Sequence, residues 1–343
     1  MSSMRRSRRS GACALAALVL MLADAGATAQ ASEPAAGGTA VEEIIEEVTI
    51  LGERAGPGLW RVRNGDNTLY LLGTLSPLPK KLEWRSREVE NVLARAQRLI
   101  PARGDVSADV GPIKAVRLFM QYRKLRDNAD DQRLDAVLPP ALFERFESLR
   151  RKYAPRERSL LERRPVLAAG ELWREALGRS GLTARNDINR TVEKLAKARK
   201  VPIERPKLRI DDPQGTLAEI GRIPLDAEIA CMSATLSRLE ADLGVARKRA
   251  EAWSVGDVDA LRSPSSAAQQ EVCWSALQQS PKIAALRSQF DEGWFALALD
   301  SLERLPVTLA VVPIDELYKR NGVLERMGAR LPRRRTLTHP LPV

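Results

Sequence analysis

The chain has 343 residues, 44% of them hydrophobic, which is enough to bury a sizeable core. Its formal charge of +11 favours anionic surfaces, although most charged residues are expected to solvate helix faces, and only 4% aromatic residues argue against nucleic-acid binding. One histidine, His339, and three cysteines exclude a histidine metal cluster and a cysteine zinc site.

The first 31 residues (1–31) have the three parts of a secretory signal peptide. Four arginines form a basic start, residues 12–23 are an apolar run, and Ala29–Ala31 offers a small-x-small cleavage site. The run is shorter than the roughly 20 residues that span a bilayer, and no later segment is apolar enough to cross one. We predict a periplasmic or secreted protein, cleaved near Ala29–Ala31, without a transmembrane segment.

Residues 32–57 form an acidic linker. Its segment Val41–Leu51 mixes glutamates with aliphatic residues and resembles the TonB box of outer-membrane receptors, which would add to TonB as a strand. No receptor plug or barrel follows. An ordinary linker or a short edge strand is therefore the favoured interpretation, and a TonB-like contact is the alternative.

The stretch 58–80 predicts a strand, a turn, a second strand and a loop. Trp60 and Val62 alternate with arginines over residues 59–63, the period-two pattern of a half-buried strand. An Asn-Gly-Asp-Asn turn follows, and residues 68–73 make an apolar strand typical of a sheet interior. Functional groups usually lie at the carboxyl ends of such strands, so we expect any site at 73–76.

Mixed helix and strand patterns predict one α/β domain over residues 58–332, followed by a basic, proline-containing tail at 333–343. Further strands are predicted at 98–101, 201–204 and 307–312, which would join the first two in a mixed sheet. Helices are predicted at 89–96, 113–125, 142–149, 167–177, 188–199, 217–253 with breaks near Gly221 and Gly244, 267–277 and 283–302.

The opening motifs resemble those of the TraB/GumN family, to which the animal Tiki proteins are related. That family has an apolar-Trp strand, a turn, an apolar strand and Gly-Thr-x-His, then Leu-Pro and Trp-Arg-Ser. This chain shows the same order and spacing in Gly73-Thr74-Leu75-Ser76, Leu78-Pro79 and Trp84-Arg85-Ser86. The resemblance covers about residues 58–332. It implies a mixed sheet surrounded by helices and a metal-dependent hydrolase, with peptide bonds the substrate proposed for Tiki-type proteins.

The residues that this resemblance assigns to the metal site are replaced here. Ser76 stands for the first histidine, Ala102 for a glutamate, and Glu316, after Asp315, for the second histidine. A serine hydroxyl is a poor ligand at neutral pH and alanine offers none, and Phe290-Asp291 does not restore the family's Arg-Asn pair. We expect no bound metal or other cofactor. The degenerate site comprises Gly73, Ser76, Ala102, Asp315 and Glu316.

Two functions follow from this loss of ligands. In the first, the chain is a catalytically lapsed accessory protein that binds a periplasmic peptide, polymer or partner protein in the old cleft. In the second, it is a peptidase-like hydrolase with a rebuilt site. Ser76 would then be a nucleophile with Lys80 or Lys81 as base, or Asp315 and Glu316 would form an acid pair. A capping hydroxyl is the commoner role for such a serine.

The third function is attachment to an anionic surface. Arginines and a lysine are densest over residues 150–164, and binding through them would weaken steeply with ionic strength.

Cys231 and Cys273 are predicted to form a disulfide. They are the two cysteines left after export, because Cys13 lies in the leader, and an oxidising compartment favours the bond. Closing a loop of 42 residues stabilises the fold by roughly 4 kcal/mol on the chain-entropy model. Two separate buried thiols are the alternative.

Overall fold

The computed structural model describes residues 56–185, 187–241, 243–261, 267–319, 321–330 and 337–338. The predicted leader, the TonB-like segment, His339 and most of the tail lie outside these residues.

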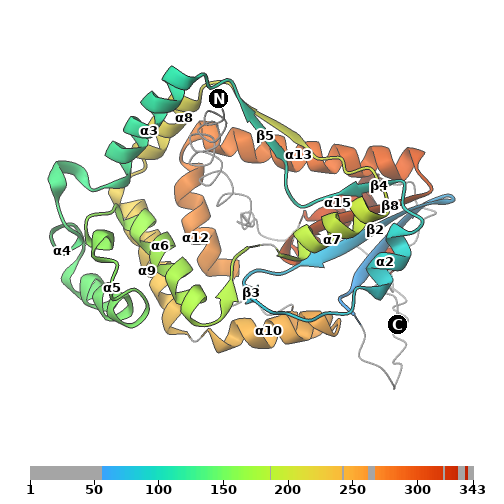
Figure 1. Cartoon of the computed structure of the whole chain (residues 1–343), viewed down its shortest axis with the longest axis horizontal. Helices are drawn as coiled ribbons and strands as arrows, with labels where there is room; N and C mark the ends of the chain where they lie inside the picture. Colours follow the sequence, from blue (N-terminus) through green and yellow to red (C-terminus); the bar gives the residue numbers. More distant parts are fainter. Residues whose placement is uncertain are drawn as a thin grey trace, which may run out of the picture.

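A five-stranded mixed sheet organises the fold, in the order β4-β8-β2-β1-β9 (Figure 1). β1 (Leu59–Asn64) and β2 (Asn67–Thr74) form the expected antiparallel hairpin. β8 (Val307–Pro313) runs parallel to β2 and to β4 (Arg98–Ile100), and β9 (Leu337–Thr338) adds antiparallel to β1. The predicted α/β fold with a mixed sheet surrounded by helices is confirmed.

The hairpin follows from the local sequence. Gly65 takes a positive φ of 62° in the turn, a conformation that glycine adopts without strain. In β1 Trp60 and Val62 are buried while Arg63 is exposed, as the period-two pattern predicts. β2 is buried from Leu69 onward because β1 and β8 flank it and helices pack against it.

One predicted strand is wrong in extent. Residues 201–204 contribute only an isolated bridge between Leu99 and Ile203. The Leu99 amide donates to the Pro202 carbonyl at 2.8 Å, and the Glu204 amide donates to the Leu99 carbonyl at 2.9 Å. Pro202 lacks an amide hydrogen, so a longer ladder cannot form through this residue.

Two small sheets were not predicted. β3 (Leu78–Pro79) pairs antiparallel with β6 (Leu182–Thr183), and β5 (Asp105–Ala108) pairs parallel with β7 (Lys207–Ile210). The two-residue strands and the wholly exposed β5 carry little periodic signal, whereas the four residues of β7 do alternate and were missed because the run is short.

Helices account for most of the remaining chain, close to the predicted ranges. The first helix ends at Leu93 rather than Ala96, and Gly256 with φ of 74° ends the segment after α10 as expected. The helices are α2 (Arg87–Leu93), α3 (Pro112–Arg126), η2 (Ala129–Asp131), α4 (Leu134–Val137), α5 (Pro140–Tyr153), η3 (Arg158–Leu161), α6 (Pro165–Arg179), α7 (Asp187–Ala198), α8 (Pro213–Gly221), α9 (Leu225–Glu240), α10 (Gly244–Ser254), α11 (Val258–Leu261), α12 (Ala267–Gln278), α13 (Pro281–Arg304), α14 (Ile314–Tyr318) and α15 (Val323–Arg330).

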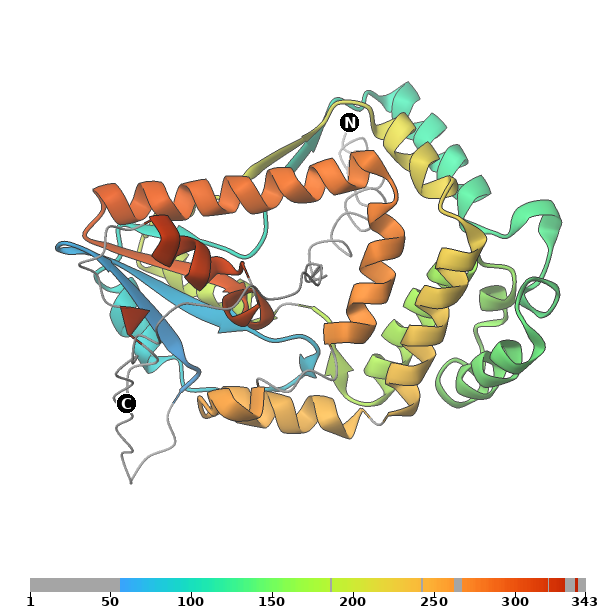
Figure 2. The ribbon, with the colours of Figure 1, turned by 180° about the vertical axis from the view of Figure 1, so that it is seen from behind.

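The apolar core has two large clusters. One surrounds the sheet and includes residues of α7, α10 and α13, and the other lies among α5, α6 and α9. Figures 1 and 2 show α10, α12 and α13 extending between these two parts, with α5 at the end far from the sheet. The site described below belongs to the sheet cluster.

The predicted disulfide is confirmed. Cys231 of α9 and Cys273 of α12 are bonded with an S–S distance of 2.07 Å, so the bridge ties the helical part to the segment that leads into α13. Within the described ranges, no helix combines the length and apolarity needed to cross a membrane.

Candidate functional site

The carboxyl ends of β2, β8 and β4 lie at the same edge of the sheet because the three strands run parallel. Leu72 stands beside Val311, and Ile100 stands beside Ala310. The residues that follow these strands are therefore brought to one edge, as the sequence predicts for the candidate site.

A cleft lies between α13 and the chain that follows β8. It contains about 530 Å³ of empty space, part of which is open to solvent. Ala102 and Glu316 both line it, so two of the family positions are brought together. The other walls combine aromatic and charged side chains, namely Phe290, Trp294, Phe295, Arg287, Lys319, Arg326 and Asp291.

Glu316 is held between two cations. Its carboxylate accepts from Arg287 Nη2 at 3.2 Å and pairs with Lys319 Nζ at 2.5 Å. The Arg287 and Glu316 side chains are only 10% and 11% exposed, so little solvent screens the pair. Arg287 also binds Asp291 at 2.7 Å. The one strong ligand left at the matched positions is thus already neutralised by protein cations.

Phe290 and Asp291 lie in this cleft although sequence comparison gave them no role. Burial raises the pKa of Asp291, against the lowering effect of Arg287 beside it. The spacing of Arg287 and Asp291, four residues apart on a helix, is the sequence signal that could have paired them. Their position in the cleft depends on how α13 packs against β8, which that spacing does not reveal.

Asp315 belongs to a different contact. Its carboxylate lies 3.5 Å from Arg249 of α10, and its side chain is 47% exposed. Burial of its carboxyl group raises the pKa of Asp315, and the nearby charge of Glu316 adds to this, while Arg249 lowers it. Asp315 pairs with Arg249, whereas Glu316 pairs with Arg287 and Lys319.

Gly73 is a packing position. Its carbonyl accepts a 2.7 Å hydrogen bond from Trp253 Nε1. A Cβ at this position would lie 3.0 Å from both Ile314 Cγ1 and Trp60 Cζ3. Trp84 packs edge-on against Trp253, with ring centroids 5.6 Å apart. Glycine at the end of β2 thus permits the close approach of α14 and of the Trp60 ring.

Ser76 and Lys80 are turned toward the helical part. Ser76 Oγ donates to the Ala184 carbonyl at 3.4 Å, and Lys80 Nζ donates to the Gly178 carbonyl at 2.9 Å. Ser76 precedes a cis peptide bond to Pro77 and is not among the described residues that line the cleft. Ser76, the hypothetical nucleophile, and Lys80, one hypothetical base, therefore each bind a main-chain carbonyl.

Ala102 adjoins a buried polar network. Its amide donates to Asn189 Oδ1 at 3.1 Å, and Asn189 Nδ2 donates to Glu193 at 3.1 Å. Burial would raise the pKa of Glu193, but Arg103 and Arg205, each 2.7 Å away, lower it below its usual value. The end of β4 therefore also carries a carboxylate neutralised by arginine.

These residues do not fit the divalent metal that the family resemblance implies. Ala102 has no donor side chain, Glu316 already binds two cations, and the Ser76 hydroxyl contacts Ala184. In the part of the chain that the structure describes, no three histidine, cysteine, aspartate or glutamate side chains gather as a metal site.

The basic 150–164 cluster is split between internal and surface residues. Arg150, Arg163 and Arg164 each bind a carboxylate within the protein. Four cations of the cluster are exposed, namely Arg151, Lys152, Arg156 and Arg158.

The fold and site define a mixed α/β protein whose strand-end positions are occupied by ion pairs and close packing. The TraB/PrgY/gumN family model matches residues 58–330, and the chain belongs to this family. A search of curated proteins gives no match, and a search of solved structures gives none either.

Proposed function

We propose that this chain is a non-catalytic member of the TraB/PrgY/gumN family that binds a ligand in the cleft beside α13. The observation that carries the proposal is the Glu316 carboxylate, held by Arg287 and Lys319 next to the side chain of Ala102. A catalytic metal site needs about three protein ligands and an open position. Here the matched residues supply one carboxylate, and that carboxylate is neutralised.

The cleft walls support a ligand with apolar and charged parts. Phe290 and Trp294 contribute aromatic surface, while Lys319 and Arg326, 25% and 32% exposed, contribute cationic groups to the same cleft. A peptide or polymer segment combines both features, as does an exposed loop of a partner protein. Trp294 would report occupancy through its fluorescence.

Metal analysis tests the non-catalytic assignment. The chain from residue 32 onward, dialysed and digested for elemental analysis, is expected to contain no stoichiometric transition metal and to show no metal-dependent peptide hydrolysis. A stoichiometric metal that tracks with activity would overturn the proposal.

Restoring the ligands tests the positions themselves. If the imidazole introduced at position 76 turns from Ala184 toward the cleft, the triple variant Ser76→His, Ala102→Glu, Glu316→His should gain affinity for a divalent ion that none of the single variants shows. Because Arg287 competes for the remaining carboxylates, adding Arg287→Gln should strengthen that gain. Folded variants without added metal affinity would show that these positions are not the former site.

A hydrolase with a rebuilt site is the second proposal. It is favoured by one observation: Asp291 and Glu316 line the same cleft, and burial raises the pKa of Asp291, as a general acid requires. This proposal predicts peptide hydrolysis that survives chelation and falls at least tenfold in Asp291→Asn. Arg151→Gln, on the far surface, is the matched control.

We also propose export to the periplasm or beyond, on the basis of the predicted leader 1–31, with an acidic linker at 32–57. The Cys231–Cys273 bridge supports this location, because disulfides persist in oxidising compartments. A TonB contact through Val41–Leu51 is tested by pull-down with the TonB C-terminal domain. Equal retention of the intact chain and a 41–51 deletion would exclude it.

A further inference from the structure

Helix α3 presents large apolar side chains to solvent. Ile113 is 77% exposed, Val116 65%, Phe119 51% and Met120 50%. Residues three and four apart share a helix face, so Ile113, Val116 and Met120 form one stripe and Phe119 widens it. Single exposed apolar residues are ordinary, but a contiguous set of this size marks an interaction surface.

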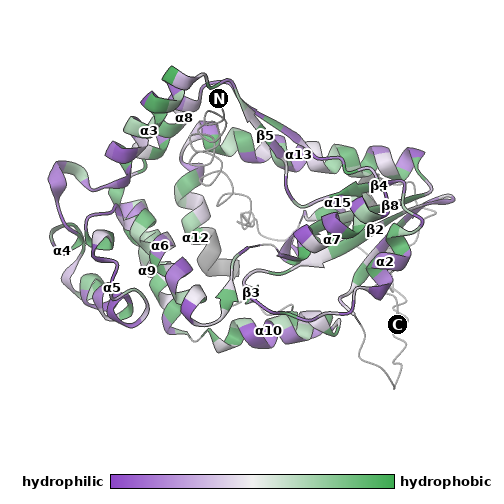
Figure 3. Ribbon diagram, viewed as in Figure 1, coloured by the Kyte–Doolittle hydropathy of each residue, from purple (hydrophilic) through white to green (hydrophobic). Residues whose placement is uncertain are grey.

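The same helix is basic. It carries five cationic side chains and no acidic one, namely Lys114, Arg117, Arg123, Lys124 and Arg126. Lys114 and Arg126 pair with aspartates just outside the helix ends. Arg117, Arg123 and Lys124 make no ion pair with any residue that the structure describes. Apolar and cationic groups therefore share the exposed side of α3, and both kinds of residue are visible along it in Figure 3.

The opposite side of α3 is fixed to the protein. Gln121 Nε2 donates to the Gln214 carbonyl of α8 at 3.0 Å, and Leu125 fills the space at Gly221, where a Cβ would lie 2.4 Å from Leu125 Cδ2. Leu118 is buried beneath the helix. Figures 1 and 2 show α3 on the outer side of α8, at a corner of the molecule away from the sheet.

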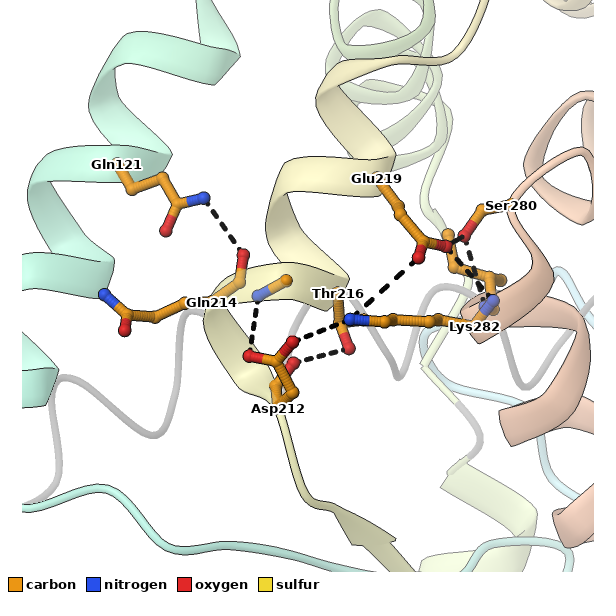
Figure 4. A network of polar contacts seen from close by, with 9 residues as sticks. Gln121, Asp212, Gln214, Thr216, Glu219, Ser280 and Lys282 are labelled. Atoms are coloured by element: carbon orange, nitrogen blue, oxygen red, sulfur yellow. Dashed lines mark hydrogen bonds and ion pairs between the residues drawn. The ribbon is translucent and has the colours of Figure 1, made fainter.

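α8 is anchored in turn to α13. Lys282 Nζ binds Asp212 at 2.7 Å, and Ser280 Oγ donates to Glu219 at 2.6 Å (Figure 4). Asp212 also caps α8 through the Gly215 amide. Through these contacts α13 fixes α8, and α8 fixes α3 with its apolar and basic face toward solvent.

We propose that α3 attaches this protein to an anionic phospholipid surface. The apolar stripe would enter the boundary between headgroups and acyl chains, with the three unpaired cations among the lipid phosphates. Charge complementarity carries the choice of occupant: a helix with five cations and no carboxylate suits a negative lipid surface. Arginine and lysine stems can lie along apolar surface while their charged ends reach the headgroups. This binding is independent of the cleft and of the function proposed for it.

Vesicle co-sedimentation tests the proposal. The chain from residue 32 onward should sediment with vesicles that mix phosphatidylglycerol with phosphatidylcholine, and far less with phosphatidylcholine alone. A basic residue near an anionic surface contributes about 1 kcal/mol to binding. Arg117→Gln, Arg123→Gln and Lys124→Gln together should therefore weaken partitioning roughly 100-fold. Ile113→Ser, Val116→Ser and Phe119→Ser together should lower the vesicle-bound fraction at least tenfold below that of the wild type at equal lipid concentration.

Matched control variants test whether binding depends on α3 or on exposed cations and apolar residues elsewhere on the surface. Arg151→Gln, Lys152→Gln and Arg156→Gln remove three exposed cations of the 150–164 cluster and should leave binding within twofold. Leu225→Ser and Val245→Ser remove apolar side chains of 50% and 46% exposure and should do the same. Circular dichroism should show every variant folded, because all substituted side chains are at the surface.

Three outcomes would overturn the proposal. The first is no binding to either kind of vesicle, and the second is binding that the α3 variants leave unchanged. The third is a concentration-dependent dimer, measured by light scattering, that dissociates in the Ile113, Val116 and Phe119 variant while vesicles remain unbound. That result would assign the face to a second copy of the chain.

Discussion

Removing the charge of Glu316 should lower the free energy of unfolding. A decrease indicates a structural role for this carboxylate, whereas an increase would indicate a catalytic role. Catalytic groups are often held at a cost to stability, so their replacement stabilises the fold. Glu316 instead sits 3.2 Å from Arg287 and 2.5 Å from Lys319. The variant Glu316→Gln keeps the shape of the side chain and removes its charge.

The expected magnitude follows from what each cation retains. Breaking a buried pair by removing one partner costs about 3–5 kcal/mol. Arg287 keeps Asp291 at 2.7 Å, and Lys319 is 25% exposed and can be solvated. We therefore expect a free-energy loss of about 2 kcal/mol, below that range, because both cations keep another partner or solvent. For a domain of about 270 residues this loss lowers Tm by about 3–4 °C.

Calorimetry or denaturant unfolding at neutral pH measures the effect. Asp315→Asn is the matched control: this neighbour is 47% exposed and contacts one arginine, Arg249, at 3.5 Å, and its pKa is raised, so removing its charge should not destabilise the fold. A Glu316→Gln protein as stable as wild type, or more stable, would refute the structural role. It would return Glu316 to the list of candidate catalytic acids.

Three further perturbations follow from the structure. Replacing Cys231 and Cys273 together by serine should lower the free energy of unfolding by about 4 kcal/mol, because the bridge closes a 42-residue separation. Chemical denaturation measures this loss, and an unchanged unfolding midpoint would contradict the prediction. Gly73→Ala should cost about 1–3 kcal/mol by overcrowding at 3.0 Å contacts, whereas the exposed Gly111→Ala should not. The hydrogen bond from Arg150 lowers the pKa of Glu147 to about 2. The stabilisation from this ionised carboxylate is therefore present above pH about 4.5 and lost as pH falls toward 2. Glu147→Gln should lower the free energy of unfolding at pH 6 by about 1 kcal/mol after solvent screening, and should match wild type near pH 2.

Strong local patterns predicted most of the fold. The alternation around Trp60, the turn at Gly65 and the apolar run of β2 each specify their own structure within a few residues. Helix α13 is likewise defined by its own apolar spacing and by a Ser280 cap that accepts from the Ile283 amide. The segment around Pro202 was overpredicted because apolarity suggests a strand while the proline prevents a ladder.

The candidate site was predicted only in part. Ala102 and Glu316 follow β4 and β8, and these strands run parallel, so both residues lie at the same edge of the sheet. Both line the same cleft. Ser76 was grouped with them by motif spacing, but its hydroxyl turns to Ala184 after β2 leaves the sheet. Asp291 was given no role: its partner Arg287 lies four residues earlier on the same helix, but its burial in the cleft depends on tertiary packing that the local sequence does not encode.

The buried carboxylates near the ends of β8 and β4 are paired with protein cations. A carboxylate buried without a partner is costly, so each of these acids needs a cation beside it. At the end of β8, Arg287 and Lys319 neutralise Glu316. At the end of β4, Arg103 and Arg205 neutralise Glu193, whose side chain is 5% exposed. Both carboxylates are therefore already neutralised by protein side chains. A divalent ion at either place would compete with these cations, so adding a single ligand should not create measurable metal affinity.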